Sequence, residues 1–190
     1  MSISSERYRS SINRNLHEVC AALMEHKIWI KLGEFNSREG IYIRGESFFN
    51  ISCKALFNDM FAHTIKVLDK NGQSATFWYL FRTNQAKIRK LKYYSLEKIE
   101  NLRNLSKKLM IIRNEAHFHI DKKGVLDSKA VWTRAGITGK ELGENLLFLH
   151  SILIELYEIE FKKSFLYCIE DYDTKDLDEI LRYSKIKNLI

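Results

Sequence analysis

Residues 138–156 read TGKELGENLLFLHSILIEL and carry the clearest helical pattern in the chain. Spacings of three and four residues place five leucines on one helix face: Leu142, Leu146, Leu149, Leu153 and Leu156. Thr138 stands three residues before Glu141, which is the form of an N-terminal capping box. The stretch therefore predicts a long helix that begins after Thr138 and buries its leucine face against other elements.

Three earlier segments repeat this apolar spacing. Their stripes are Ile12, Leu16, Val19, Leu23 and Ile30; Phe49, Cys53, Leu56, Met60 and Val67; and Ile99, Leu102, Ser106, Leu109, Arg113 and Ala116. A loop is predicted from Gly33 to Gly45, a turn at Asn71-Gly72, and a short aromatic helix from Ser74 to Phe81. Four apolar stripes predict a four-helix bundle with short additional helices.

The composition favours an all-α fold. The 190 residues include no proline, although average usage would give about nine, and long helices exclude proline from their interiors. The length suits one domain. We expect a bundle over residues 1–170 and a short C-terminal helix or tail over 171–190, where acidic residues precede basic ones.

The positive charge is concentrated in one stretch. The chain carries a formal net charge of +7, and between Gln85 and Arg113 nine basic residues face only Glu97 and Glu100. Basic residues beside Tyr93 and Tyr94 suit phosphate contacts and base stacking; a solvated helix face is the alternative. The candidate nucleic-acid-binding residues are Lys87, Arg89, Lys90, Lys92, Arg103, Lys107 and Lys108.

Arg113 occupies a position of the third stripe where an apolar residue is expected. A guanidinium there is costly unless it is paired or opens onto a cleft. It could pair with a carboxylate such as Glu155, or it could face a site, since His117 and His119 follow within six residues. The residues alone leave both interpretations open.

The run from Arg113-Asn114 to His119 resembles the signature motif of the HEPN superfamily of helical domains, named for higher eukaryotes and prokaryotes nucleotide binding. Five residues separate the arginine from the histidine, and Asp121 follows as in the abortive-infection branch of that superfamily. The stretches Ala55 to Asp59 and Leu68 to Leu80 are also similar to that branch. The resemblance covers about residues 5–165.

The resemblance implies a metal-independent endoribonuclease that acts on RNA at a site shared by the two chains of a homodimer. Such a protein would be a toxin or an antiphage effector in abortive infection, with an antitoxin or regulatory protein as a possible partner. His119 would be the acid or base, Arg113 would hold the scissile phosphate, and Asn114 would orient one of them. The alternative is a non-catalytic HEPN-like module for dimerisation or nucleic-acid binding.

At about 100° per residue, a regular helix places His117 closer to Arg113 than His119. The resemblance still favours His119, so His117 is kept as a secondary candidate. No metal or cofactor is predicted, because His117, His119 and Asp121 lack the further histidine of a His-x-His-x-Asp-His site. His63 is interpreted as a packing or interface histidine. Three unpatterned cysteines and the lack of a long apolar run predict a cytoplasmic protein without a membrane partner.

Overall fold

The computed structural model describes residues 3–39, 46–117, 128–165 and 176–179. Among these residues every regular element is helical and none is a strand. The elements are α1 (Ile3–Glu39), α2 (Glu46–Leu68), α3 (Phe77–Thr83), α4 (Gln85–Ile88), α5 (Leu96–Ile112), η1 (Arg113–His117), α6 (Ser128–Ala135) and α7 (Gly139–Phe161). The predicted all-α class is confirmed, with long helices at the four predicted stripes.

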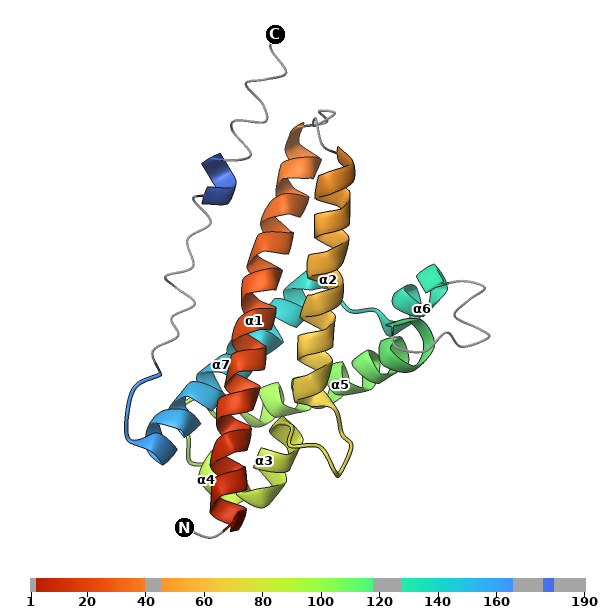
Figure 1. The fold of residues 1–190 in the computed structure, drawn as a ribbon. Helices are drawn as coiled ribbons and strands as arrows, with labels where there is room; N and C mark the ends of the chain where they lie inside the picture. Colours follow the sequence, from red (N-terminus) through yellow and green to blue (C-terminus); the bar gives the residue numbers. More distant parts are fainter. Residues whose placement is uncertain (1–2, 40–45, 118–127, 166–175, 180–190) are drawn as a thin grey trace.

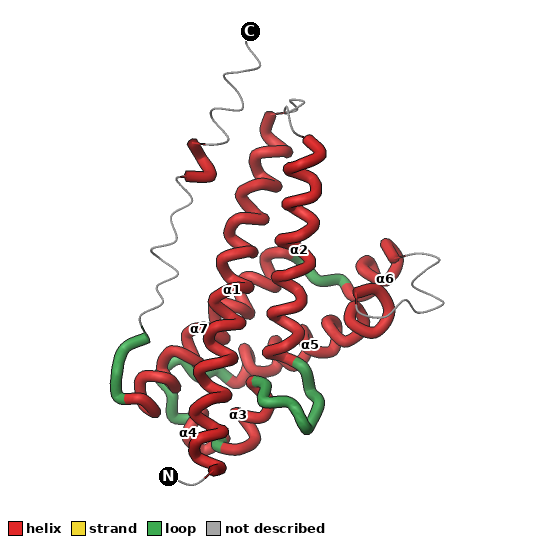
Figure 2. Tube along the Cα trace, in the orientation of Figure 1, coloured by secondary structure: helices red, strands yellow, loops and turns green. Residues whose placement is uncertain are grey.

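Helices α1 and α2 form an antiparallel hairpin (Figure 1). Helix α7 packs against α1, and α5 packs against α2 and α7. Both lie across the half of the hairpin that is nearer the N-terminus, where α3 and α4 also lie (Figure 2). None of the described helices combines the length and apolar character needed to cross a lipid bilayer.

The buried residues of the predicted stripes meet in one core, whereas Ile30, Cys53 and Leu56 are only half-buried. All five stripe leucines of α7 are buried, as are Ile12 of α1 and Met60 of α2. Ser106 is a polar residue in the apolar stripe of α5. Its hydroxyl accepts a hydrogen bond from Nε1 of Trp78 at 3.0 Å and donates one to the Leu102 carbonyl at 2.9 Å. Its polar group is therefore satisfied inside the core.

The predicted loop from Gly33 to Gly45 is wrong for its first part, since α1 continues through Gly33 to Glu39. A glycine inside a helix costs only about 1 kcal/mol relative to alanine, which packing of α1 against α2 can offset. Residues 40–45 lie outside the described residues. The aromatic helix begins at Phe77, three residues later than predicted.

The predicted cap of α7 is confirmed, because the Thr138 hydroxyl accepts a hydrogen bond from the Glu141 N–H at 3.0 Å. In the predicted C-terminal helix, residues 176–179 are helical. Asp178 there pairs with Lys31 of α1 at 2.5 Å. The other residues of 171–190 lie outside the described residues.

Replacing Gly143 with alanine is expected to lower the free energy of unfolding by about 1–3 kcal/mol. The new Cβ would lie 2.6 Å from Cε1 of His26, whose Nε2 is 2.8 Å from the Gly139 carbonyl oxygen. The matched Gly33→Ala change has open space and is expected to stabilise by about 1 kcal/mol. Urea denaturation measures both; equal effects would contradict a close α1–α7 contact.

Candidate functional site

The predicted motif begins where α5 changes its helical geometry. Helix α5 ends at Ile112, and Arg113–His117 form a π-helix, η1. A π-helix bonds residue i to i+5 and is wider than an α-helix, so the 100° per residue used to compare His117 with His119 does not apply here. The His117 side chain and all of His119 lie outside the described residues. Such π-helical turns are frequent at functional sites.

Arg113 is paired with Asp69. Its Nη1 donates to Oδ2 of Asp69 at 2.9 Å, and the side chains are 33% and 17% exposed. The suggested partner Glu155 is wrong, because its carboxylate accepts hydrogen bonds from the backbone N–H groups of Lys92 and Tyr93 at 2.7 and 3.3 Å. Arg113 is thus neither sealed in the core nor free. Asn114 is exposed.

Asp69 is itself held in place. It follows the last residue of α2, and its Oδ1 accepts a hydrogen bond from the Asn71 N–H at 3.0 Å. The preceding carbonyl, of Leu68, accepts a hydrogen bond from Nε1 of Trp78 at 3.0 Å. One carboxylate oxygen therefore stabilises the turn while the other fixes the guanidinium. Arg113 has five N–H donors, so the pair with Asp69 leaves others for an anion.

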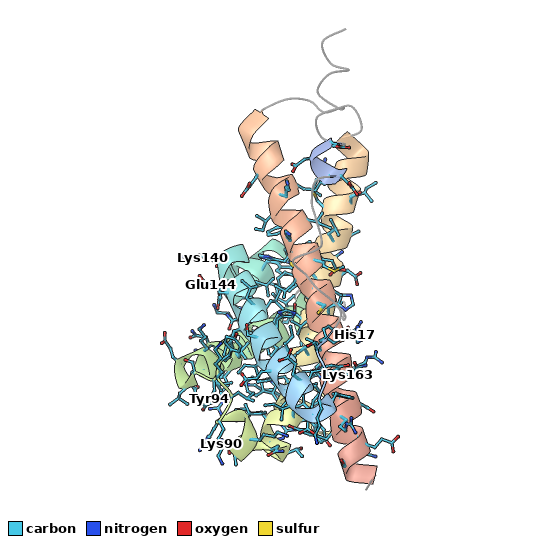
Figure 3. The ribbon with its side chains drawn as sticks, turned by 90° about the vertical axis from the view of Figure 1, so that its left-hand side faces the viewer. His17, Lys90, Tyr94, Lys140, Glu144 and Lys163 are labelled. Atoms are coloured by element: carbon cyan, nitrogen blue, oxygen red, sulfur yellow. The ribbon has the colours of Figure 1, made fainter. Side chains whose placement is uncertain are left out.

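The candidate nucleic-acid-binding residues do not share one environment. Three of the seven have carboxylate partners: Lys87 pairs with Glu160, Arg103 with Glu100 at 2.6 Å, and Lys108 with Glu141 at 2.8 Å. The other four are exposed: Arg89, Lys90, Lys92 and Lys107. Proximity in the sequence therefore does not make this stretch one uniform basic surface. Lys140, near the start of α7 and outside this stretch, lies well away from Lys90 and Tyr94 (Figure 3).

A cationic pocket is lined in part by Lys70, the residue after Asp69. Its volume is about 380 Å³, and it is lined by Lys70, Trp78, Phe81, Arg82, Gln85 and Arg103. Burial lowers the pKa of Lys70, and the nearby charges of Lys107 and Arg103 lower it further. An anion bound here would relieve this repulsion. Lys70 and Arg82 were not predicted because they precede the basic stretch; the Asp69-Lys70 pair just before the predicted turn was the available signal.

A second cluster of titratable groups lies between α1 and α2. Nδ1 of His63 is 2.6 Å from Oε2 of Glu18, and its Nε2 is 3.7 Å from Oε1 of Glu25 and 3.7 Å from Oδ1 of Asp59. Ligand atoms of Glu25, Asp59 and His63 lie within 4.8 Å of one another. His63 was predicted to be a packing or interface histidine because Glu18 and Glu25 lie far away in the chain; Asp59, four residues before His63 on α2, was the available local signal.

The two glutamates of α1 respond oppositely to this environment. Burial raises the pKa of Glu18, but hydrogen bonds from His63 and Lys66 outweigh it and the net pKa is lowered. Burial raises the pKa of Glu25 to about 8, helped by the nearby negative charge of Asp59. At neutral pH, and without a bound cation, Glu25 therefore keeps its proton.

Glu25→Gln is expected to remove a pH dependence of stability. The Glu25 pKa is about 8 in the folded protein, against an ordinary value of 4.5 for a glutamate. The stability that the protonated Glu25 gives the folded protein is therefore fully present below about pH 4.5 and is lost as the pH rises to about 8. At pH 8 the variant should be more stable than the wild type by up to roughly 4 kcal/mol, because one unit of pKa difference corresponds to about 1.4 kcal/mol. Urea denaturation in metal-free buffer measures this; the exposed Glu144→Gln control should follow the wild type. Parallel curves for Glu25→Gln and wild type would contradict the assignment.

No family model, curated protein or solved structure matches this chain. The functional interpretation therefore depends on the motif, the Arg113–Asp69 pair and the cationic pocket.

Proposed function

We propose that this protein is a HEPN-type endoribonuclease that cleaves RNA without a metal ion and acts as a homodimer. One observation carries the proposal. Arg113, the first residue of the motif, is fixed by Asp69 at the junction of α5 and η1 while a third of its side chain remains exposed. The long helices α1, α2, α5 and α7 are compatible with the helical bundle that the proposal requires.

The chemistry needs only groups that the motif and the RNA provide. The ribose 2′-oxygen attacks the adjacent phosphorus, its proton passes to a base, and the bond to the 5′-oxygen breaks as an acid protonates that oxygen. An imidazole can perform either proton transfer, and a homodimer supplies two copies of His119, one for each. Arg113 stabilises the growing phosphate charge, Asn114 orients the phosphate or the imidazole, and His117 is a secondary proton carrier.

The cationic pocket supports an RNA substrate. Arg103, which lines the pocket, and Arg113 are ten residues apart on α5 and its continuation, a distance of about 15 Å along the helix axis. One RNA strand can therefore contact the pocket and Arg113 together. The toxin or antiphage role, an antitoxin or regulatory partner and a cytoplasmic location belong to this proposal through the HEPN resemblance alone.

The ends of the cleaved RNA test the reaction type. Wild-type protein and labelled single-stranded RNA are incubated in EDTA, and the fragments are separated and treated with phosphatase. Attack by the 2′-oxygen predicts fragments with 2′,3′-cyclic phosphates and 5′-hydroxyls. Fragments with 5′-phosphates would show that water attacked instead, and would contradict the proposal.

Neutralising the pocket is expected to weaken RNA binding. A Lys70→Gln/Arg82→Gln protein should lose about one to two units from the slope of log affinity against log salt, because each lost phosphate contact removes about 0.7 on single strands. Fluorescence anisotropy at several salt concentrations measures this. Lys140→Gln, on α7 and 86% exposed, is the matched control and should leave the slope unchanged. An unchanged slope in the double variant would show that the RNA phosphates do not contact Lys70 and Arg82 in the pocket.

A second candidate function is a non-catalytic HEPN-like module for dimerisation or nucleic-acid binding. The Arg113–Asp69 ion pair favours it, since a purely structural role for Arg113 would satisfy the same contact. In that case RNA binds and is not cleaved.

A further inference from the structure

His63 of α2 faces carboxylates on both of its ring nitrogens. Glu18 lies against Nδ1 at 2.6 Å, and Glu25 and Asp59 each place an oxygen 3.7 Å from Nε2. The first distance is a hydrogen bond, whereas 3.7 Å is too long for one. Nε2 and the two carboxylate oxygens therefore lie close together, but Nε2 makes no hydrogen bond to either oxygen.

Two Nε2–oxygen separations of 3.7 Å, with all three ligand atoms within 4.8 Å of one another, suit three donors around one metal ion. Zinc binds imidazole nitrogen at about 2.0–2.1 Å and carboxylate oxygen at about 2.0–2.2 Å. At such bond lengths, two donors separated by a tetrahedral to trigonal angle lie about 3.4–3.6 Å apart. We propose that Glu25, Asp59 and His63 bind a divalent transition-metal ion, with Zn²⁺ as the best match, and that this ion joins α1 to α2.

The surroundings of the cluster support this assignment. Glu18 holds Nδ1 of His63, so that Nε2 is the nitrogen directed at the ion, as in many histidine–metal sites. Oε1 of Glu25 is the oxygen near Nε2 of His63, whereas Oε2 is buried and has no hydrogen-bond partner among the described residues; an ion bound by both oxygens would satisfy it. Imidazole with carboxylates selects zinc-like ions over magnesium, which prefers oxygen ligands and keeps its waters.

The charges of the cluster also suit a divalent cation. With Glu25 and Asp59 ionised, the ligands carry two negative charges. Glu18 adds a third, which Lys66 neutralises at 3.2 Å. A divalent ion therefore brings the group close to neutrality, and binding releases the proton of Glu25.

The proposed ion has a structural role that is separate from RNA cleavage. His63 and Asp69 are six residues apart, which is about 9 Å along a helix axis, so an ion on His63 is too far away to bond a phosphate held by Arg113. The metal site goes beyond the proposed function, and each can fail without the other.

Zn²⁺ titration of the full chain tests the site. Protein freed of metal with EDTA and then dialysed is titrated by calorimetry with Zn²⁺ and, separately, with Mg²⁺. We expect one equivalent of Zn²⁺ to bind at least about a hundredfold more tightly than Mg²⁺. His63→Ala and Asp59→Asn should each weaken Zn²⁺ binding by at least about tenfold to a hundredfold, and Glu18→Gln by a similar factor.

Two variants keep the result interpretable. Asp59 is 62% exposed, so Asp59→Asn leaves the core intact even if His63→Ala does not fold. His17→Gln, on the same helix as Glu18, is the control and should bind Zn²⁺ like the wild type. Failure of the wild type to bind one equivalent at micromolar Zn²⁺, or equal affinity in Asp59→Asn and wild type, would overturn the assignment.

Discussion

Replacing Arg113 with alanine is expected to reduce the rate of RNA cleavage by about a hundredfold to a thousandfold, the usual effect of losing one transition-state donor. The guanidinium that Asp69 positions at 2.9 Å would no longer stabilise the phosphate charge. Initial rates on labelled RNA measure the loss. Arg14→Ala, which removes a largely exposed guanidinium on α1, is the matched control and should cleave at the wild-type rate.

The same variant separates catalysis from structure. Loss of a partly exposed ion pair should cost only about 1 kcal/mol of stability, and Asp69→Asn should show a similar cost. A cleavage rate for Arg113→Ala equal to that of the wild type, with only this small destabilisation, would contradict a catalytic role. It would instead favour the non-catalytic module.

Trp78→Ala is expected to lower the free energy of unfolding by about 3–5 kcal/mol. The indole is buried against Phe77 and Phe81 and donates to both the Leu68 carbonyl and the Ser106 hydroxyl. Its loss leaves a cavity and removes both hydrogen bonds. Because Leu68 precedes Asp69, the change should also loosen the carboxylate that holds Arg113.

Urea denaturation measures the effect of this change. Trp78→Phe keeps most of the packing and should cost about 1–3 kcal/mol through the hydrogen bonds alone. Tyr93→Ala, at an aromatic residue that is largely exposed, should cost less than either. If Trp78→Ala cost no more than Tyr93→Ala, Trp78 would not be the link between the core and the Arg113 pair.

Local patterns were enough to predict most of the fold. The stripes of α1, α2, α5 and α7 report burial directly, and Thr138 marks a helix start because capping depends on residues three apart. The helix end predicted at Gly33 was wrong, because a glycine weakens a helix only modestly and packing decides whether the helix continues. The π-helix at Arg113 depends on packing around the end of α5, which no periodicity in the sequence reports.

The site was only partly predictable for a related reason. Arg113 was detectable as a charged residue in an apolar stripe, but its partner Asp69 is 44 residues earlier and belongs to another helix end. His63 meets Glu18 across 45 residues, so no local spacing could connect them. Lys70 and Arg82 meet Arg103 only in the folded chain, because α2 packs against both α3 and α5.

One gel tests the central claim most directly. Purified wild type and His119→Ala protein are each incubated with mixed cellular RNA, with and without EDTA, at a temperature at which both remain folded. We predict cleavage by the wild type that persists in EDTA and is absent in the variant. Equal cleavage by both proteins, or wild-type cleavage that EDTA abolishes without unfolding the protein, would contradict a metal-independent reaction that depends on His119.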